Sequence, residues 1–187
     1  RAVADALAWL AAHQEPDGNW SCSRFGAIEV HSDVGVTSLA LLAFLGAGYT
    51  HTEPNTYSET IRRGLNWLLA TQRANGDLRL RGRIYCHAMA TLALSEALAM
   101  TGDARLIDPA QRAVDWLVEA QNPESGGWRY GPGQFGDTSV YGWAVLALHS
   151  ARGAGLQVPV ITWRQAQRWL RLVSSGKSGG LASYRPG

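Results

Sequence analysis

The sequence repeats one short phrase, Trp-Leu-x-x-x-Gln, and this repeat limits the folds that the chain can adopt. The phrase begins at Trp9, Trp67 and Trp116, and a fourth copy at Trp169 has Ser174 in place of Gln. Successive copies lie 58, 49 and 53 residues apart. Recurrence at such a period is typical of arrays in which one supersecondary unit stacks on the next. We therefore expect a row of related units that share a core.

Each unit has the pattern of an amphipathic helix, a turn and an apolar helix. Around Trp67, for example, Ile61, Leu65 and Leu68 follow helical spacing and leave one polar face. A Gly-containing turn comes next, and then a segment that is apolar nearly all round and so has to be buried. These apolar segments span 33–47, 85–100 and 137–151. The pattern predicts an all-α fold of outer helices covering inner ones, with no sheet and a further outer helix at 161–173.

Composition fits one globular domain and excludes several classes of protein. Of the 187 residues 46% are hydrophobic and 17% charged, which excludes a disordered chain, and a net charge of +2 gives no reason to expect nucleic acid as a partner. The uncharged stretch 34–50 is interpreted as a buried helix and not as a transmembrane span. Cys22 and Cys86 lack the spacing of a zinc clip and fix no redox compartment, so localisation is left open.

Two of the turns carry a recognisable motif. Gln14 with Gly18-Asn19-Trp20, and Gln121 with Gly126-Gly127-Trp128, resemble the QW motif of squalene and oxidosqualene cyclases, which protein prenyltransferase β subunits share in looser form. The second turn, Asn75-Gly76-Asp77, has no Trp. We expect the Gln amide to bond backbone groups at neighbouring helix ends while the Trp packs over it. The motif residues are therefore interpreted as structural.

The resemblance implies an α/α toroid, with residues 1–187 as a single repeat domain. The chain holds about three outer/inner helical hairpins plus one further outer helix, which is fewer than a closed toroid of that family has. The domain is therefore expected to be incomplete at its C-terminus. It would be a fragment of a longer toroid or a half-toroid that pairs with a second copy. The apolar face of 161–173, including Ile161 and Trp169, is expected to be only partly covered.

The catalytic motifs of the resembled families are missing from the sequence. Squalene cyclases protonate an alkene with an Asp of a D-x-D-D motif, and the nearest match here is Asp137-Thr138-Ser139-Val140, with one carboxylate. The D-D-x-x-D that holds Mg²⁺ in class I terpene synthases is absent. Protein prenyltransferases hold zinc with an Asp-x-Cys pair and a His, and Ser139 stands where the thiolate would be. We therefore predict no cofactor.

Polar and aromatic side chains near the starts of the inner helices are the candidate site. Asp33 and Asp137 are the catalytic candidates, although both can instead cap their helices, and Cys86 and His87 with an Asp could hold a metal. The ligand-binding candidates are Tyr85, His87, Phe135, Tyr141, Trp143 and Glu96, the last as the one charge well inside an inner helix. Phe25, Tyr130 and His31 belong to the same region, and Arg79, Arg81 and Arg83 form a basic loop beside it.

Three functions remain open on these observations. The first is a toroid domain that binds an apolar, isoprenoid-like ligand or a protein partner in the inner-helix cavity. The second is an enzyme, a squalene-hopene-cyclase-like isomerase or a prenyltransferase, with a non-standard acid or metal site. The third is a polysaccharide-active α/α barrel, for which no convincing carboxylate pair is found.

We predict that the purified chain holds no tightly bound zinc. Ser139 replaces the expected thiolate, and only Cys86 and His87 remain as soft or borderline ligands near Asp137. Elemental analysis of protein purified without added metal tests this, and about one zinc per chain would contradict it.

Overall fold

The structure is a computed structural model that describes residues 1–25 and 32–186. Seven α-helices occupy most of these ranges: α1 (Ala2–Ala12), α2 (Asp33–Gly46), α3 (Ser58–Thr71), α4 (Ile84–Thr101), α5 (Ile107–Glu119), α6 (Thr138–Gly153) and α7 (Val160–Val173). Two short 3-10 helices, η1 (Ser23–Phe25) and η2 (Ala104–Leu106), lie between them. The prediction of an all-α chain is confirmed.

One small sheet departs from the expectation of no strands. Strands β1 (Ser174–Ser175) and β2 (Leu181–Ala182) pair antiparallel at the C-terminal end. The chain can reverse there because Gly176 and Gly179 adopt positive φ angles of 81° and 62°. Two residues per strand are too few to show the alternating pattern by which strands are predicted.

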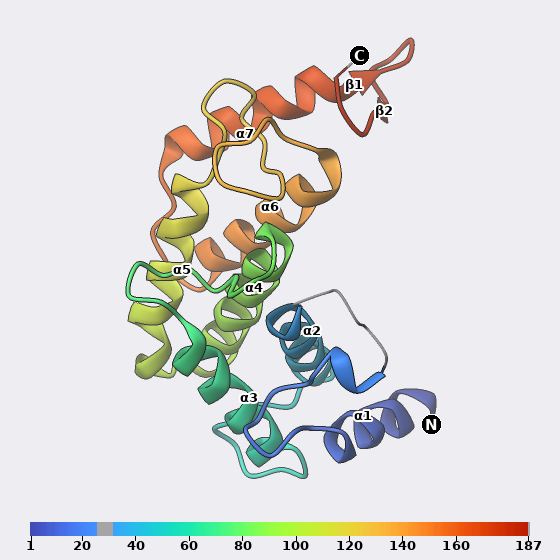
Figure 1. Ribbon diagram of the computed structural model, residues 1–187, viewed down its shortest axis with the longest axis vertical. Helices are drawn as coiled ribbons and strands as arrows, with labels where there is room; N and C mark the ends of the chain where they lie inside the picture. The colour runs from blue at the N-terminus through green and yellow to red at the C-terminus, as the bar shows by residue number, and fades with distance from the viewer. Residues whose placement is uncertain (26–31, 187) are drawn as a thin grey trace.

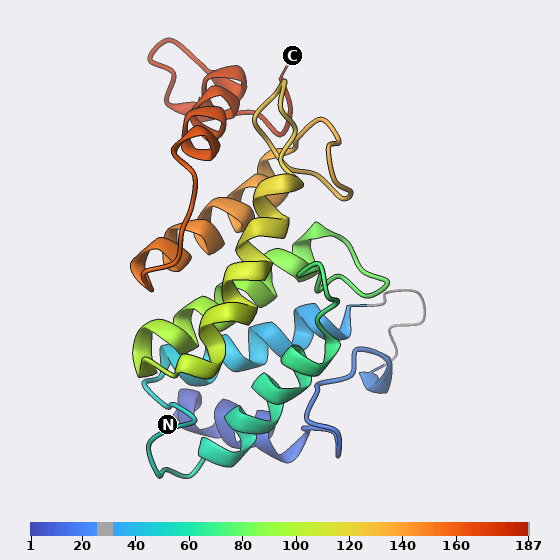
Figure 2. The same cartoon turned by 90° about the vertical axis from the view of Figure 1, so that its left-hand side faces the viewer.

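The helices alternate between two sets along the chain (Figures 1 and 2). Of the inner helices α2, α4 and α6, α4 lies between the other two and packs against both. The outer helices α1, α3, α5 and α7 follow in turn, and α3 packs on α2 while α5 packs on α4 and α6. The central place of α4 explains its composition, since it buries residues over most of its circumference. Its buried Thr91 and Ser95 hydroxyls each donate to the carbonyl four residues earlier, at 2.8 Å.

A glutamine amide connects each turn to the next outer helix. Gln14 Nε2 donates to the carbonyl of Gly18 at 2.8 Å and to that of Thr60, in the first turn of α3, at 2.9 Å. The same two bonds join Gln72 to Gly76 and Pro109 (3.3 and 2.9 Å) and Gln121 to Gly126 and Thr162 (2.9 and 3.2 Å). The expected role of the Gln amides is confirmed in all three turns, including the one without a Trp.

The turn glycines touch the backbone of the next outer helix. Gly126 has φ +75°, and a Cβ built on it would lie 1.9 Å from the Gln165 carbonyl oxygen in α7. Gly18 and Gly76 meet Arg63 and Arg112 in the same way, at 2.5 and 2.1 Å. Both the backbone angle and the close approach therefore require glycine at this place in the turn.

The turn indoles bind the outer helix of their own unit. Trp20 Nε1 donates to the Leu10 carbonyl and Trp128 Nε1 to the Leu117 carbonyl, each at 2.8 Å. Leu78 takes this place in the second turn and is fully buried. Each turn is thus fixed to the helix before it and to the helix after it.

The expectation of an open face on α7 is wrong for Trp169. This indole is completely buried, whereas Ile161 is 55% exposed. Gly127 and Gly136 lie against the Trp169 ring, and Phe135 meets it edge-on at 5.9 Å between ring centres. The connection between α5 and α6 therefore folds back over α7 and covers the face that the helical pattern leaves open.

No helix within the described ranges is both long and apolar enough to cross a membrane. The stretch 34–50, which is uncharged, forms most of α2, and eight residues of that helix are buried. Most of this helix is buried, as predicted, but Leu39 is 44% exposed, so the helix is not buried on all sides.

Replacing Gln14 or Gln121 by Ala should lower the stability of the fold by about 1–3 kcal/mol each, because the turn carbonyls lose their donor. Thermal melts of Gln14→Ala and Gln121→Ala should both shift down. Gln167→Ala, at an exposed position on α7, serves as the control. Melting temperatures equal to that of the control would contradict a stabilising role.

Candidate functional site

The starts of α4 and α6 bring a buried carboxylate next to two hydroxyl groups. Asp137 is fully buried and caps α6, since its Oδ1 accepts from the Val140 amide at 2.9 Å. Ser139 Oγ donates to the same oxygen at 2.7 Å, and the Tyr85 hydroxyl from α4 donates to Ser139 Oγ. Ser139 is exposed and Tyr85 half-buried. A chain of hydrogen bonds therefore runs from the buried carboxylate to the surface.

The second oxygen of Asp137 has no hydrogen-bond donor. Oδ2 is buried without a hydrogen-bond partner, and the Arg129 Nε lies 3.9 Å away, itself without a hydrogen bond. A buried carboxylate oxygen normally accepts a hydrogen bond. The free-energy cost of leaving Oδ2 without one has to be offset by the contacts of Oδ1 or retained for function. Capping, one of the two predicted roles of Asp137, is confirmed.

Two tyrosines and an arginine lie beside this carboxylate. The Arg83 guanidinium lies over the Tyr130 ring, 4.4 Å from its centre, and the Tyr130 hydroxyl is 3.1 Å from that of Tyr184. The hydrogen bond with Tyr130 is the main reason that the pKa of Tyr184 rises to about 12. Tyr184 is therefore a neutral phenol at pH 7, able to donate or accept a hydrogen bond.

The first amides of α4 and α6 are hydrogen-bonded by the turn of the next unit along the chain. The Ile84 amide at the start of α4 donates to the Tyr130 carbonyl at 3.1 Å, and the Thr138 amide at the start of α6 donates to the Tyr184 carbonyl at 3.0 Å. The turns thus satisfy helix-end amides that would otherwise need water. They also bring Tyr130 and Tyr184 to the same end of the inner helices as Asp137.

Asp33 occupies a different setting from Asp137. It is the first residue of α2, and its Oδ1 accepts from the Cys22 amide at 2.8 Å. The prediction that Asp33 caps its helix is wrong, because the carboxylate ties α2 to the preceding segment instead. Within the described residues no group of three His, Cys, Asp or Glu side chains can hold a metal ion.

His87 is enclosed by backbone groups. Its Nδ1 accepts from the Leu78 amide at 3.1 Å and its Nε2 donates to the Ala113 carbonyl at 2.9 Å, so both nitrogens are used by the neutral ring. Burial lowers the pKa of His87 to about 4. The structure places His87 between the second turn and α5, where it holds the two together.

Tyr141 occupies the matching position in α6. Its hydroxyl donates to the Ala166 carbonyl of α7 at 3.1 Å, and burial raises its pKa to about 12. Phe135 lies against Trp169, as described above, and Trp143 is a half-buried residue of α6. Among the predicted ligand contacts, only Tyr85 therefore lies in the hydrogen-bonded group at Asp137.

The remaining predicted residues have structural contacts or lie outside the described part. Arg79 donates to Asp77 at 2.9 and 3.0 Å and lies over the Trp116 ring at 4.5 Å, whereas Arg81 is exposed. His31 and the side chain of Phe25 are outside the described residues.

Glu96 lies towards the other end of α4, in an apolar pocket of about 250 Å³. We call it the Glu96 pocket, and its lining is Leu42, Leu45, Gly46, Leu92, Glu96, Met100 and Leu146. Ser150 Oγ donates to Glu96 Oε1 at 2.6 Å. Sequence reasoning found Glu96 but not its neighbours, because leucines in an apolar helix give no sign of which ones the fold leaves uncovered.

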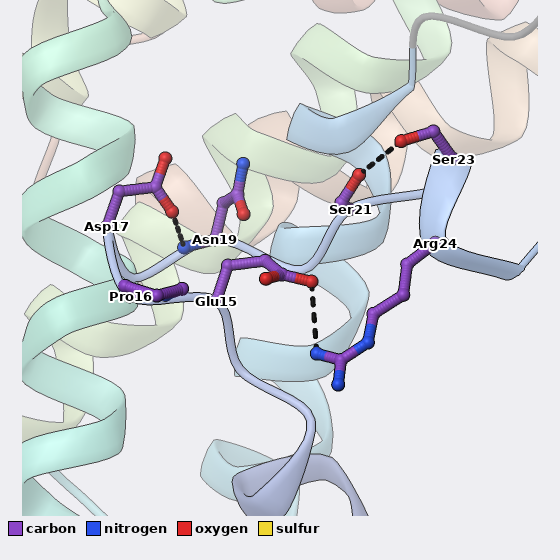
Figure 3. Close-up of a pocket in the computed structure, with 7 residues that line it drawn as sticks. All are labelled: Glu15, Pro16, Asp17, Asn19, Ser21, Ser23 and Arg24. Atoms are coloured by element: carbon purple, nitrogen blue, oxygen red, sulfur yellow. Dashed lines mark hydrogen bonds and ion pairs between the residues drawn. The ribbon is translucent and has the colours of Figure 1, made fainter.

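A wider pocket of about 520 Å³ lies at the first turn (Figure 3). Its polar groups bond to one another: Arg24 pairs with Glu15 at 3.1 Å, and Ser21 with Ser23 at 2.8 Å. It is lined only by residues of the chain from Glu15 to Arg24, at a distance in sequence from the inner-helix candidates. We give it no part in the function.

The neutral state of His87 predicts a loss of stability in acid. The pKa of His87 is about 4 in the folded chain and about 6.5 when unfolded, so between these values only the unfolded chain binds the proton. Stability should be complete above pH 6.5 and fall towards pH 4, by up to about 1.4 kcal/mol per pH unit from this group.

Urea unfolding of wild type and His87→Gln across this pH range measures the effect. The free energy of unfolding of the variant should fall less between pH 6.5 and pH 4, because the amide can occupy the site without titrating. His149→Gln, which removes an exposed imidazole, should keep the wild-type slope. If the free energy of unfolding depended on pH equally in wild type and His87→Gln, the loss of stability in acid could not be assigned to His87.

Comparison with known proteins finds a partial similarity to a terpenoid-diphosphate synthase. No family model matches the chain. The chain is 30% identical over 138 residues to a drimenyl diphosphate synthase of Streptomyces showdoensis, and the match covers 72% of this chain. The matched part is 24% of that protein, so the chain spans about a quarter of the relative's length. This similarity supports a relationship between the chain and proteins of the terpene-cyclase type.

Proposed function

We propose that this chain is a terpene-cyclase type domain that binds an apolar, isoprenoid-like ligand on the uncovered face of its inner helices. The observation that carries the proposal is the exposure of large apolar side chains there. Leu39 of α2, Met100 of α4 and Leu146 of α6 are 44%, 41% and 51% exposed. Met100 and Leu146 line the same pocket, and exposed apolar side chains that gather in this way usually mark a binding site.

The Glu96 pocket gives this face a concave part. Its volume of about 250 Å³ is slightly below that of a typical small-molecule site, which suits one end of an elongated ligand. Burying apolar surface there is favourable by about 25 cal/mol per Å², so a ligand with several isoprene units gains enough to bind. Apart from the Glu96 carboxylate, the side chains that line the pocket carry no hydrogen-bonding group of the kind that would select a polar ligand.

The relative supports the same class of ligand. Its name states that it makes drimenyl diphosphate, a terpenoid. The comparison gives no support to the polysaccharide-active alternative.

A charge placed on the inner face should weaken ligand binding. Leu146→Asp puts a carboxylate into the apolar pocket, and we expect it to weaken binding of farnesol, a neutral isoprenoid alcohol, at least about tenfold. Leu170→Asp is the matched control, since Leu170 is a similarly exposed leucine on α7. Equilibrium dialysis with labelled farnesol measures both. The proposal fails if wild type does not bind farnesol or if Leu146→Asp binds it equally well.

A second candidate function is proton transfer by Asp137 in an isoprenoid cyclisation. The observation that favours it is the buried carboxylate linked to the surface through Ser139 and Tyr85. In this scheme the hydroxyl groups turn so that the hydrogen bonds run opposite to the directions seen here. A protonated Asp137 carboxyl then donates its proton to Ser139 Oγ, the Ser139 proton moves to the Tyr85 oxygen, and the Tyr85 hydroxyl proton goes to the ligand. Each hydroxyl gains one proton and loses one, so the chain is left with the Asp137 carboxylate.

Turnover of farnesyl diphosphate, a linear isoprenoid diphosphate, tests the second candidate. Products are identified by mass spectrometry after removal of the diphosphate. Asp137→Asn keeps a capping side chain but carries no transferable proton, so turnover should fall at least about a hundredfold. Asp115→Asn, on the outer helix α5, should leave it unchanged. The candidate is excluded if wild type yields no cyclic product or Asp137→Asn yields as much.

A further inference from the structure

We propose that the Glu96 pocket is a binding site for a hydrophobic monocation, such as an ammonium ion that carries an alkyl chain. This inference rests on the proposed function only in placing a ligand on the same face of the inner helices. Beyond that function, it specifies that the ligand group next to Glu96 is positively charged.

The pocket combines apolar walls with one negative charge. Among its lining residues Glu96 is the only charged side chain, and within the described ranges no ion pair with Lys, Arg or His neutralises it. The Ser150 hydroxyl donates to Oε1 at 2.6 Å, which orients the carboxylate without cancelling its charge. A half-buried carboxylate with one neutral hydrogen bond is suited to a cation.

Two helix ends add to the negative potential. Gly46 is the last residue of α2, and Met100 lies in the last turn of α4. The C-terminal end of a helix carries a partial negative charge of about half an elementary charge, which favours cations within one turn. The helix ends and Glu96 therefore act in the same direction.

The walls decide what kind of cation fits. Ca²⁺ and Mg²⁺ need about six oxygen ligands, whereas this pocket offers the carboxylate of Glu96 and the nearby hydroxyl of Ser150. A neutral ligand can fill the apolar walls but gives Glu96 no opposite charge, so it should bind more weakly than a cation of the same size, and an anion would be repelled. A quaternary alkyl ammonium ion suits both the leucines and the carboxylate, and it loses little hydration on leaving water because its nitrogen carries no N–H groups.

Three ligands with eight-carbon chains test the charge preference. Octyltrimethylammonium, 1-octanol and octanoate are titrated into the whole chain, with NMR detection of bound ligand. The cation should bind at least about tenfold more tightly than the alcohol, or 1.4 kcal/mol, and octanoate should bind most weakly. Octanoate binding as tightly as the cation would overturn the proposal.

Glu96→Gln removes the charge and keeps the size of the side chain. The variant should lose at least about tenfold in affinity for the cation while its affinity for 1-octanol stays within about twofold. Glu119→Gln, an exposed position on α5, should bind both as wild type does. Thermal melts establish that each variant is folded. Unchanged cation binding by folded Glu96→Gln would overturn the proposal.

Salt gives a measurement that needs no variant. Raising sodium chloride from about 0.05 to about 0.5 M should weaken binding of the cation to wild type but not that of the alcohol. Equal effects of salt on both ligands would count against a charge contact. Farnesol binding without a cation preference overturns this inference alone, and Glu96-dependent cation binding without farnesol binding overturns the proposed function alone.

Discussion

The bond between each turn glutamine and the next outer helix is the interaction on which the fold depends most. A side-chain amide with two donors reaches one carbonyl in its own turn and one in the helix that follows, as Gln14 does with Gly18 and Thr60. The bond within the turn joins residues close in sequence, and the bond to the next helix joins residues far apart in sequence. Because it recurs at Gln72 and Gln121, it fixes successive outer helices at the same place relative to their turns.

The inner helices follow from this arrangement. Once the outer helices and turns hold them in a row, α4 lies between α2 and α6, and each of the three inner helices keeps an exposed large apolar side chain. The uncovered face carries Leu39 and Leu146, and the Glu96 pocket lies on it. At the other end, the turns lie over the starts of α4 and α6 and enclose Asp137. The stacking of the units therefore produces both the uncovered face and the buried carboxylate.

Sequence reasoning predicted the elements well and the side-chain contacts less well. The four segments predicted with bounds, 33–47, 85–100, 137–151 and 161–173, agree with α2, α4, α6 and α7 to within about two residues, because amphipathic and apolar segments differ in period and composition. It placed Asp137 at a helix start, and its cap is present. It failed for Asp33 and Trp169, whose partners come from connections without a periodic pattern. It did not foresee that His87 binds backbone atoms, since that depends on how closely the second turn approaches α5.

The close approach at Gly126 has a consequence for how such a chain can vary. The atom that meets the turn is a backbone carbonyl of the next outer helix, belonging to Gln165 here and to Arg63 and Arg112 in the earlier units. Because every residue type offers the same carbonyl, substitutions on the helix side leave the contact unchanged, whereas the glycine on the turn side admits no other residue. Drift in sequence can therefore erase the likeness between the outer helices while their spacing stays constant.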